Sequence, residues 1–333
     1  MKIVVDDKIP FIKGVFEPYA KVLYLPGREI SALDVRDADA LVVRTRTKCN
    51  RALLEGSSVK AIASATIGYD HIDTAWCRGA GIEWSNAPGC NSGSVQQYVA
   101  CALEWLSRKH AFALGGMTLG IVGVGHVGSK VAAVGRHFGM KVLLCDPPRR
   151  RAEGPEGFAS LDRIISDADI ITLHVPLTKS GPDATEHLFD AGRLAMLKKS
   201  QWLINSSRGE VVEGEALKTV LKDGGIAGAV LDVWEGEPDI DRELLGLVDL
   251  GTPHIAGYSL DGKAAGTRAA VRFTAKVLGL PLADWEPGEL PASEKPFYDI
   301  EADSAALKAS PSSFESLRGN YPVRRETPGL FDV

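Results

Sequence analysis

Cysteine is scarce and unpaired in this chain. Its 333 residues include five cysteines, an odd number, and no two of them form a C-x-x-C pair. This usage argues against a disulfide framework and favours a reduced, cytoplasmic protein. The five are Cys49, Cys77, Cys90, Cys101 and Cys145.

Long apolar runs and an excess of positive charge are also lacking. No run approaches the roughly 18 residues that a membrane helix needs. Met1-Lys2 leads directly into the apolar Ile3–Val5, which is typical of a first strand rather than of a signal peptide. The net charge of −5 argues against general nucleic-acid binding but leaves room for a local basic pocket. We therefore expect a soluble protein with no membrane, nucleic-acid or metal partner.

The segment 119–128 predicts a dinucleotide-binding motif. Leu119–Val122 is a short apolar run of the kind that forms a buried parallel strand. Gly123, Gly125 and Gly128 follow in G-x-G-x-x-G spacing. The first glycine permits a tight turn, the second lets a pyrophosphate approach the backbone, and the third lets a helix pack closely on the strand.

A helix, a second strand and an acid follow these glycines in the order that the motif requires. The segment Ser129–Phe138 is predicted to form the helix, and the free N–H groups of its first turn would face a pyrophosphate. Lys141–Cys145 predicts the strand, and Asp146 ends it, 18 residues after Gly128 (146 − 128). An acid there hydrogen-bonds the ribose hydroxyls of NAD and repels the 2′-phosphate of NADP. The arginines at 149–151 leave an NADP alternative open, although a solvated basic loop explains them more simply.

Short strands and helices alternate along the rest of the chain, which predicts parallel α/β sheets. The other predicted strands are Ile3–Val5, Val22–Leu25, Ala40–Val43, Ile62–Ser64, Ile82–Trp84, Ile170–His174, Trp202–Asn205, Ala229–Leu231 and Val248–Leu250. The other predicted helices are Ser92–Lys109, Glu213–Lys222 and Ala264–Leu278.

The length of the chain and this alternation predict two α/β domains with an appendage. Residues 94–255 are predicted to form a doubly wound parallel sheet of the Rossmann type. Residues 1–93 and 256–280 are predicted to form a flavodoxin-like domain that binds substrate and acts as a lid. Residues 281–333 are predicted to form a proline-rich linker and a C-terminal segment too short for a core of its own. The apolar residues of that segment, such as Phe314 and Tyr321, would dock on another surface, for example a second subunit.

Three ionisable residues each follow a strand of the second domain: Arg208, Glu237 and His254. Oxidation of an alcohol by NAD needs a base for the hydroxyl proton, and neutral histidine suits that role. A carboxylate on the far ring nitrogen would orient the histidine, and an arginine would grip a substrate carboxylate through two hydrogen bonds. Each residue also has a purely structural explanation: a buried or capping histidine, a solvated acid, or an arginine paired with Glu210 or Glu213.

Three motifs resemble the D-2-hydroxyacid dehydrogenase family, and the glycine motif stands where that family has it. The motifs are Asn205-Ser206-Ser207-Arg208-Gly209, Leu231-Asp232-Val233-Trp234-Glu235-Gly236-Glu237-Pro238 and Thr252-Pro253-His254-Ile255-Ala256-Gly257. The resemblance covers about the first 280 residues. It implies that Arg208 and Glu237 are catalytic and that His254 transfers the proton, in a cleft between the domains that closes over substrate.

The same resemblance implies binding positions. The cofactor positions are Gly123, Gly125, His126, Val127, Gly128, Asp146, Val175, Ser206, Ser207, Arg208, Asp232 and Gly257. The substrate positions are Thr45, Thr66 and Tyr258. Further matches in the chain, such as Cys145-Asp146-Pro147-Pro148, imply oxidation of 4-phospho-D-erythronate at C2 by NAD, a step of pyridoxal phosphate (vitamin B6) biosynthesis. Arg44, Arg46, Lys48 or Lys263 could bind the phosphate, which we infer from charge and position.

The family also implies a homodimer, although its C-terminal dimerisation domain is longer than the segment here. The loop Gly68-Tyr69-Asp70-His71 departs from the family's common Gly-Thr-Asp-His. Two rival functions remain: a sister dehydrogenase acting on phosphoglycerate, glycerate or hydroxypyruvate, and a non-catalytic protein that senses NAD(H).

Overall fold

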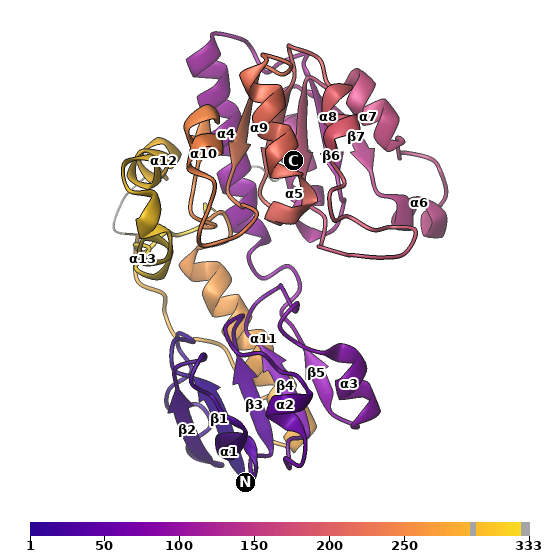
Figure 1. Cartoon of the computed structure of the whole chain (residues 1–333). Coiled ribbons are helices and arrows are strands. Elements are labelled where there is room, and N and C mark those ends of the chain that lie inside the picture. Colours follow the sequence, from indigo (N-terminus) through magenta and orange to yellow (C-terminus); the bar gives the residue numbers. More distant parts are fainter. Residues whose placement is uncertain (294–297, 328–333) are drawn as a thin grey trace. The chain divides into compact units, whose positions relative to one another are not determined.

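The computed structural model describes residues 1–293 and 298–327, which divide into two compact units (Figure 1). Unit 1 comprises Met1–Asn91 and Ser259–Ala292, and unit 2 comprises Ser92–Tyr258 and the chain from Ser293 onward. The chain beyond residue 280, which was predicted to form a linker and a C-terminal segment without a core of its own, is divided between the units: the part up to Ala292 belongs to unit 1 and the rest to unit 2. The parts of that segment at 294–297 and 328–333 lie outside the described residues.

Unit 1 contains a five-stranded parallel sheet in the order β2-β1-β3-β4-β5. This order is the flavodoxin-like one, as the sequence predicted. The strands are β1 (Lys2–Asp6), β2 (Lys21–Leu25), β3 (Ala40–Val43), β4 (Ala61–Ser64) and β5 (Glu83–Ser85). The helices are α1 (Ala32–Val35), α2 (Arg51–Leu54), α3 (Thr74–Gly79) and α11 (Leu260–Leu278).

Both faces of this sheet are buried, because successive side chains of a strand point to opposite faces. Val4 and Leu41 pack in one apolar cluster with residues of α1, α2 and α3. Ile3 and Val42 pack in a second cluster with residues of α11. The near-continuous apolar character of these strands follows from this two-sided burial.

Unit 2 contains a six-stranded parallel sheet in the order β11-β10-β9-β8-β6-β7. A parallel bridge from Leu144 to Phe158 stands where a further strand would lie beside β7. With that bridge included, the order is that of a Rossmann sheet, and it reverses between β6 and β8. The strands are β6 (Thr118–Val122), β7 (Lys141–Cys145), β8 (Ile170–Leu173), β9 (Trp202–Asn205), β10 (Gly228–Leu231) and β11 (Leu250–Gly251).

Helices cover both faces of the unit 2 sheet. Ile170 and Ile204 belong to an apolar cluster with α4 and α5, while the adjacent Ile171 and Leu203 belong to a cluster with α7 to α10. This alternation confirms the predicted doubly wound sheet. The helices are α4 (Ser92–His110), α5 (His126–His137), α6 (Pro147–Glu153), α7 (Leu161–Asp167), α8 (Ala191–Ala195), α9 (Gly214–Lys222) and α10 (Arg242–Leu247).

The C-terminal segment adds α12 (Ile300–Ala309) and α13 (Phe314–Gly319) to unit 2. Leu307 and Phe314 are buried in the apolar core of that unit, and the hydroxyl of Ser304 accepts a hydrogen bond from the backbone of β11. The surface on which Phe314 docks is therefore part of the same chain. Among the described residues, every helix is too short or too polar to cross a membrane.

Candidate active site

The glycine loop lies at the point where the strand order of unit 2 reverses. Gly123 has φ +88°, and a Cβ atom there would come within 2.6 Å of the carbonyl oxygen of His174 at the end of β8. A Cβ at Gly128 would come within 2.0 Å of the carbonyl oxygen of Gly123. The first and third glycines are therefore required by a left-handed turn and by close packing.

Helix α5 begins at His126, three residues before the predicted start. Gly125 caps it without a side-chain hydrogen bond, and a Cβ atom at Gly125 would meet no atom within 4 Å. The open approach at Gly125 and the N–H groups of the first turn of α5 suit a pyrophosphate. Ser206, after β9, has a buried hydroxyl with no hydrogen-bond partner among the described residues. The residues present therefore fit a dinucleotide.

Asp146 ends β7 and lies beside the glycine loop. Its carboxylate accepts hydrogen bonds from the backbone N–H of Val124 at 2.8 Å and of Arg149 at 3.0 Å. Arg149 itself donates to the carboxylate of Glu153 and to the carbonyl oxygen of Val124, and Arg151 pairs with Asp183. Two of the three arginines at 149–151, which could have bound the 2′-phosphate of NADP, are thus held in ion pairs.

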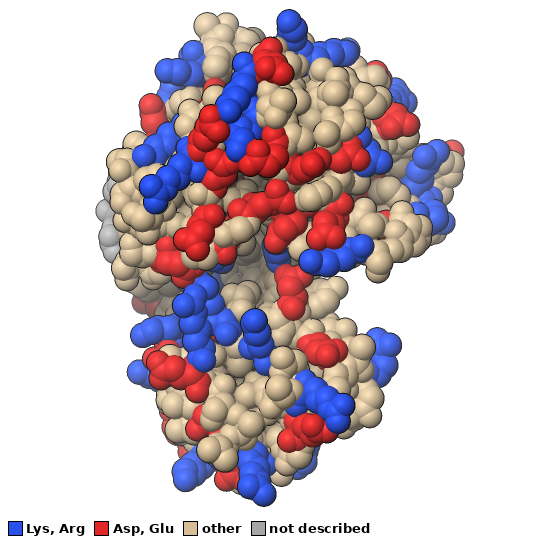
Figure 2. Space-filling model, viewed as in Figure 1, with Lys and Arg blue, Asp and Glu red and all other residues tan. Residues whose placement is uncertain are grey.

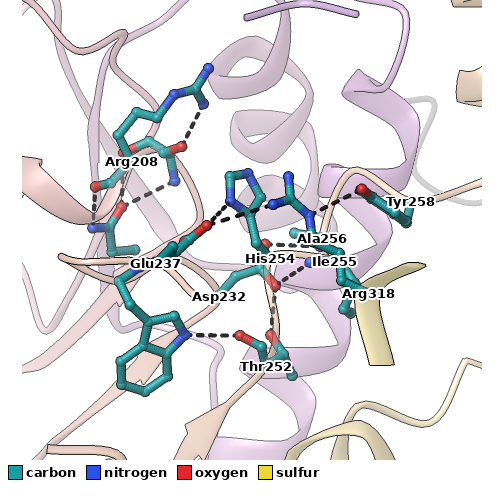
Figure 3. Close-up of polar contacts among 12 residues, drawn as sticks. Arg208, Asp232, Glu237, Thr252, His254, Ile255, Ala256, Tyr258 and Arg318 are labelled. Atoms are coloured by element: carbon teal, nitrogen blue, oxygen red, sulfur yellow. Dashed lines mark hydrogen bonds and ion pairs between the residues drawn. The ribbon is translucent and has the colours of Figure 1, made fainter. Parts of the chain in front are cut away.

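The structure brings Glu237 and His254 into contact (Figure 3). Oε2 of Glu237 lies 2.8 Å from Nδ1 of His254, and Oε1 accepts a hydrogen bond from the backbone N–H of Trp234 at 3.0 Å. Burial works against the charge of Glu237, but His254, Arg318 and the Trp234 N–H together hold the pKa of Glu237 below its ordinary value. A carboxylate only accepts, so His254 donates through Nδ1, and in the neutral ring Nε2 is then the acceptor.

Asp232 shapes the turn that carries His254. The His254 backbone has φ +56°, a left-handed conformation that is rare outside glycine, and its N–H donates to the carbonyl oxygen of Asp232 at 2.7 Å. The buried carboxylate of Asp232 accepts three more hydrogen bonds, from the hydroxyl of Thr252 and the N–H groups of Ile255 and Ala256. Burial raises the pKa of Asp232, although His254 and these donors oppose the effect.

Arg208 follows β9 and precedes a glycine that close packing requires. A Cβ atom at Gly209 would lie 2.0 Å from the carbonyl carbon of Trp234, so the Arg208 loop runs directly against the loop of Glu237. The guanidinium of Arg208 donates to the carbonyl oxygen of Ser207 at 2.8 Å. In Figure 3 it lies apart from the contact between Glu237 and His254.

The remaining predicted positions divide between the two units. Unit 1 carries Thr45, which is exposed, and Thr66, whose hydroxyl bonds to Ser64 and to the carbonyl oxygen of Gly68. Unit 2 carries Tyr258, whose hydroxyl accepts a hydrogen bond from Arg318 at 3.0 Å. Val127 lies on the first turn of α5, Val175 lies against Gly123, and Ser207 and Gly257 lie in the loops after β9 and β11.

Sequence reasoning missed the charged residues that the C-terminal segment places at this site. Arg318 and Arg324 contact the loop at 254–258. Residues 314–326 resemble part of the family's C-terminal domain, but that resemblance indicated dimerisation and gave these arginines no role at the site. No periodicity in the sequence marks them, because only the packing of the segment on unit 2 brings them to the loop.

Comparisons with known proteins agree with this geometry. Residues 94–256 match the NAD-binding domain of D-isomer-specific 2-hydroxyacid dehydrogenases. A protein of Bacteroides fragilis named erythronate-4-phosphate dehydrogenase is 52% identical over 98% of this chain and 97% of its own length. The chain belongs to the D-2-hydroxyacid dehydrogenase family. Its cofactor is NAD, as the acid at Asp146 predicted.

Two further relatives also cover most of the chain. An Escherichia coli O157:H7 protein, also named erythronate-4-phosphate dehydrogenase, is 42% identical over all of this chain and 94% of its own length. The crystal structure of an Aquifex aeolicus D-lactate dehydrogenase with NAD and lactic acid superposes with a TM-score of 0.69. That protein is 28% identical, and the match covers 84% of this chain and 96% of that one.

Proposed function

We propose that this protein oxidises 4-phospho-D-erythronate to (R)-3-hydroxy-2-oxo-4-phosphooxybutanoate with NAD, a step of pyridoxal phosphate biosynthesis. The reaction type is inferred from the contact between Glu237 and His254 beside an NAD-binding sheet. The substrate is inferred from two relatives that are 52% and 42% identical over nearly the whole chain.

In this reaction His254 takes the proton of the C2 hydroxyl on Nε2, and the hydrogen on C2 leaves as hydride. Bound NAD supplies the hydride acceptor. Glu237 keeps the proton of the His254 ring on Nδ1 and stabilises the imidazolium that forms. The products are the 2-oxo acid, NADH and a proton, which His254 then releases.

Arg208 binds the substrate carboxylate in this proposal. Its planar fork matches a carboxylate through two parallel hydrogen bonds and draws electron density from the adjacent C2. Thr45, Thr66 and Tyr258 contribute hydroxyl groups that hydrogen-bond the substrate. His126, Val127, Asp146, Val175, Ser206, Ser207, Asp232 and Gly257, with the three glycines of the motif, form the cofactor site.

The substrate phosphate needs cationic side chains, and the sequence offers Arg44, Arg46, Lys48 and Lys263. Arg44 is ion-paired with Asp6, whose side chain is fully buried, so its charge is already balanced. Arg46 and Lys48 line a hollow of about 390 Å³ in unit 1 together with Arg28, so three cationic side chains meet there. Figure 2 shows a group of Lys and Arg beside several Asp and Glu on the visible face of unit 1, and a larger group of Asp and Glu flanked by Lys and Arg on that of unit 2. We therefore assign the phosphate to Arg46 and Lys48.

A substrate panel tests the proposal. The purified protein is assayed with 4-phosphoerythronate, 3-phosphoglycerate, D-glycerate and D-lactate, each with NAD or NADP, and with a 2-oxo acid added to recycle retained NADH. Preference for 4-phosphoerythronate by at least tenfold in kcat/KM is the expected result. Preference for another acid would indicate that the protein is a related dehydrogenase with a different substrate. Binding of NADH without turnover of any acid would identify an NAD(H) sensor.

The homodimer is part of the proposal and rests on the family alone. Buried Phe314 packs within its own chain, so a dimer would use other surfaces than this side chain. Sedimentation of the purified protein decides the point: a species of twice the chain mass of 35.6 kDa is expected.

A further inference from the structure

The C-terminal segment places one arginine directly on the catalytic loop. Nε of Arg318, on α13, donates to the hydroxyl of Tyr258 at 3.0 Å, and its Nη1 lies 3.8 Å from Oε2 of Glu237. The guanidinium also lies over the ring of Tyr258, 5.7 Å from the ring centre. Figure 3 shows Arg318 between Tyr258 and the contact of Glu237 with His254.

The buried setting of Arg318 makes these contacts more than a surface ion pair. Only 15% of its side chain is exposed, and Glu237 is 18% exposed. A charge removed from water in this way needs a partner, because a buried charge without one destabilises the folded protein. Burial works against the charge of Arg318, but Tyr258 and Glu237 hold its pKa above the ordinary value.

A second arginine anchors the same segment to the same loop. Arg324 is 6% exposed, and its Nη2 donates to the carbonyl oxygens of Ala256 at 2.6 Å and Ile255 at 3.3 Å. Its guanidinium stacks 4.3 Å from the centre of the Tyr298 ring. The segment is therefore attached at two points of the loop, which fixes where Arg318 can lie.

We propose that Arg318 is a positioning residue for the reaction: from the C-terminal segment it holds the carboxylate of Glu237 and the hydroxyl of Tyr258 in place, and Glu237 in turn orients His254. The inference rests on the proposed role of His254 as proton acceptor. It gives the C-terminal segment a part in catalysis within its own chain.

The charges around Glu237 indicate what removal of Arg318 would do. Oε2 of Glu237 faces two groups that can carry positive charge, His254 and Arg318. A variant without the Arg318 guanidinium leaves only His254 beside this oxygen. Glu237 would then bind a proton at a higher pH, and a protonated acid orients His254 less well. Among the described residues, the other ionisable groups that face these side chains are Asp232 near His254, and Tyr258 and Glu315 near Arg318.

The test compares three variants of the full-length protein. Arg318→Met removes the charge and keeps the length, while Arg318→Lys restores the charge without the planar fork. Tyr321→Phe is the matched control, because it removes a hydrogen bond from the same segment, to Asp303 at 2.6 Å, and keeps the ring that packs against Tyr258. The readouts are kcat and KM for the hydroxy acid, NADH affinity, Tm, and kcat/KM as a function of pH.

For Arg318→Met we expect kcat to fall about 10- to 100-fold, with NADH affinity within about twofold of wild type. The acid limb of kcat/KM should move to higher pH by about 1 unit. Arg318→Lys should recover part of both effects, and Tyr321→Phe should show neither.

Two results would overturn the inference. One is that activity and Tm fall together, and to the same extent, in Arg318→Met and Tyr321→Phe. That result would mean that Arg318 has a structural role only. The other is a raised KM with unchanged kcat, which would place Arg318 in substrate binding. The comparison uses whichever 2-hydroxy acid the wild type turns over best, so it is independent of whether 4-phosphoerythronate is the substrate.

Discussion

Oε2 of Glu237 lies 2.8 Å from Nδ1 of His254, and this contact defines the proton chemistry of the site. Glu237 is favoured as an anion, so the ring of His254 carries its proton on Nδ1 and accepts the substrate proton on Nε2. The two residues come from loops after β10 and β11, neighbouring strands of one parallel sheet.

Replacement of His254 by alanine should abolish most of the turnover and spare cofactor binding. General base catalysis contributes about 10²- to 10⁴-fold, so kcat should fall by that factor. NADH affinity, measured by fluorescence titration, should stay within about threefold. His137→Ala, at the far end of α5, is the control and should keep full activity. An equal loss of NADH binding in His254→Ala would remove His254 from proton transfer.

Arg208→Lys should be a severe change although it keeps the charge. The ammonium group of lysine cannot make two parallel hydrogen bonds to a carboxylate, and one lost charge-assisted bond corresponds to about 10- to 100-fold in kcat/KM. The matched control is Arg163→Lys, which alters an exposed pair with Asp167 on α7. Steady-state kinetics that leave kcat/KM of Arg208→Lys near wild type would contradict the clamp.

Asp232→Asn should destabilise the protein and misplace the catalytic turn. An asparagine NH₂ group at either oxygen position would face a donor, since Thr252, Ile255 and Ala256 all donate to this side chain. One unsatisfied buried contact costs about 1–3 kcal/mol of unfolding free energy. Chemical denaturation measures the loss, and exposed Asp239→Asn in the same stretch should cost far less. Equal stabilities of the two variants would argue against the role of Asp232 in holding the turn that carries His254.

Asp146→Ser should weaken the preference for NAD over NADP. The carboxylate of Asp146 stands at the end of β7 and would repel a 2′-phosphate, which a serine would not do. We expect the ratio of kcat/KM values, NAD over NADP, to fall at least tenfold. Asp162→Ser on α7 is the control, with an unchanged ratio. If Asp146→Ser kept the wild-type ratio, another residue would have to discriminate between the two cofactors.

Acid should destabilise the protein through two partly buried histidines, His71 and His174. Burial lowers the pKa of His174 to about 3 and that of His71 to about 4. An unfolded histidine binds a proton near pH 6.5, so between that pH and the folded values the unfolded state binds more protons. The unfolding free energy should therefore fall as the pH is lowered below 6.5, by up to about 1.4 kcal/mol per pH unit for each histidine.

Denaturation curves at several pH values test this prediction. The slope of unfolding free energy against pH should be smaller in His174→Gln than in wild type. His137→Gln, with an exposed ring, should keep the wild-type slope. A His174→Gln slope equal to that of wild type would show that other groups cause the acid loss.

Much of the fold could be predicted because its signals are local. The apolar run Leu119–Val122 and the three glycines specify a strand, a turn and a helix through their own backbone preferences. The start of α5 was misplaced by three residues, since the glycines at 125 and 128 disfavour a helix by propensity. The first turn forms there because Gly128 packs against Gly123.

The sequence by itself determined the chemistry: which residues could bind NAD, take a proton and grip a carboxylate, and that each follows a strand. The expected contact of Glu237 with His254 is present in the structure. Only the tertiary structure decided the pairings that the sequence did not predict: Asp6 balances Arg44, and Arg318 reaches Tyr258 across 60 residues of chain. These pairings depend on packing between distant segments, and no local preference or spacing encodes such contacts.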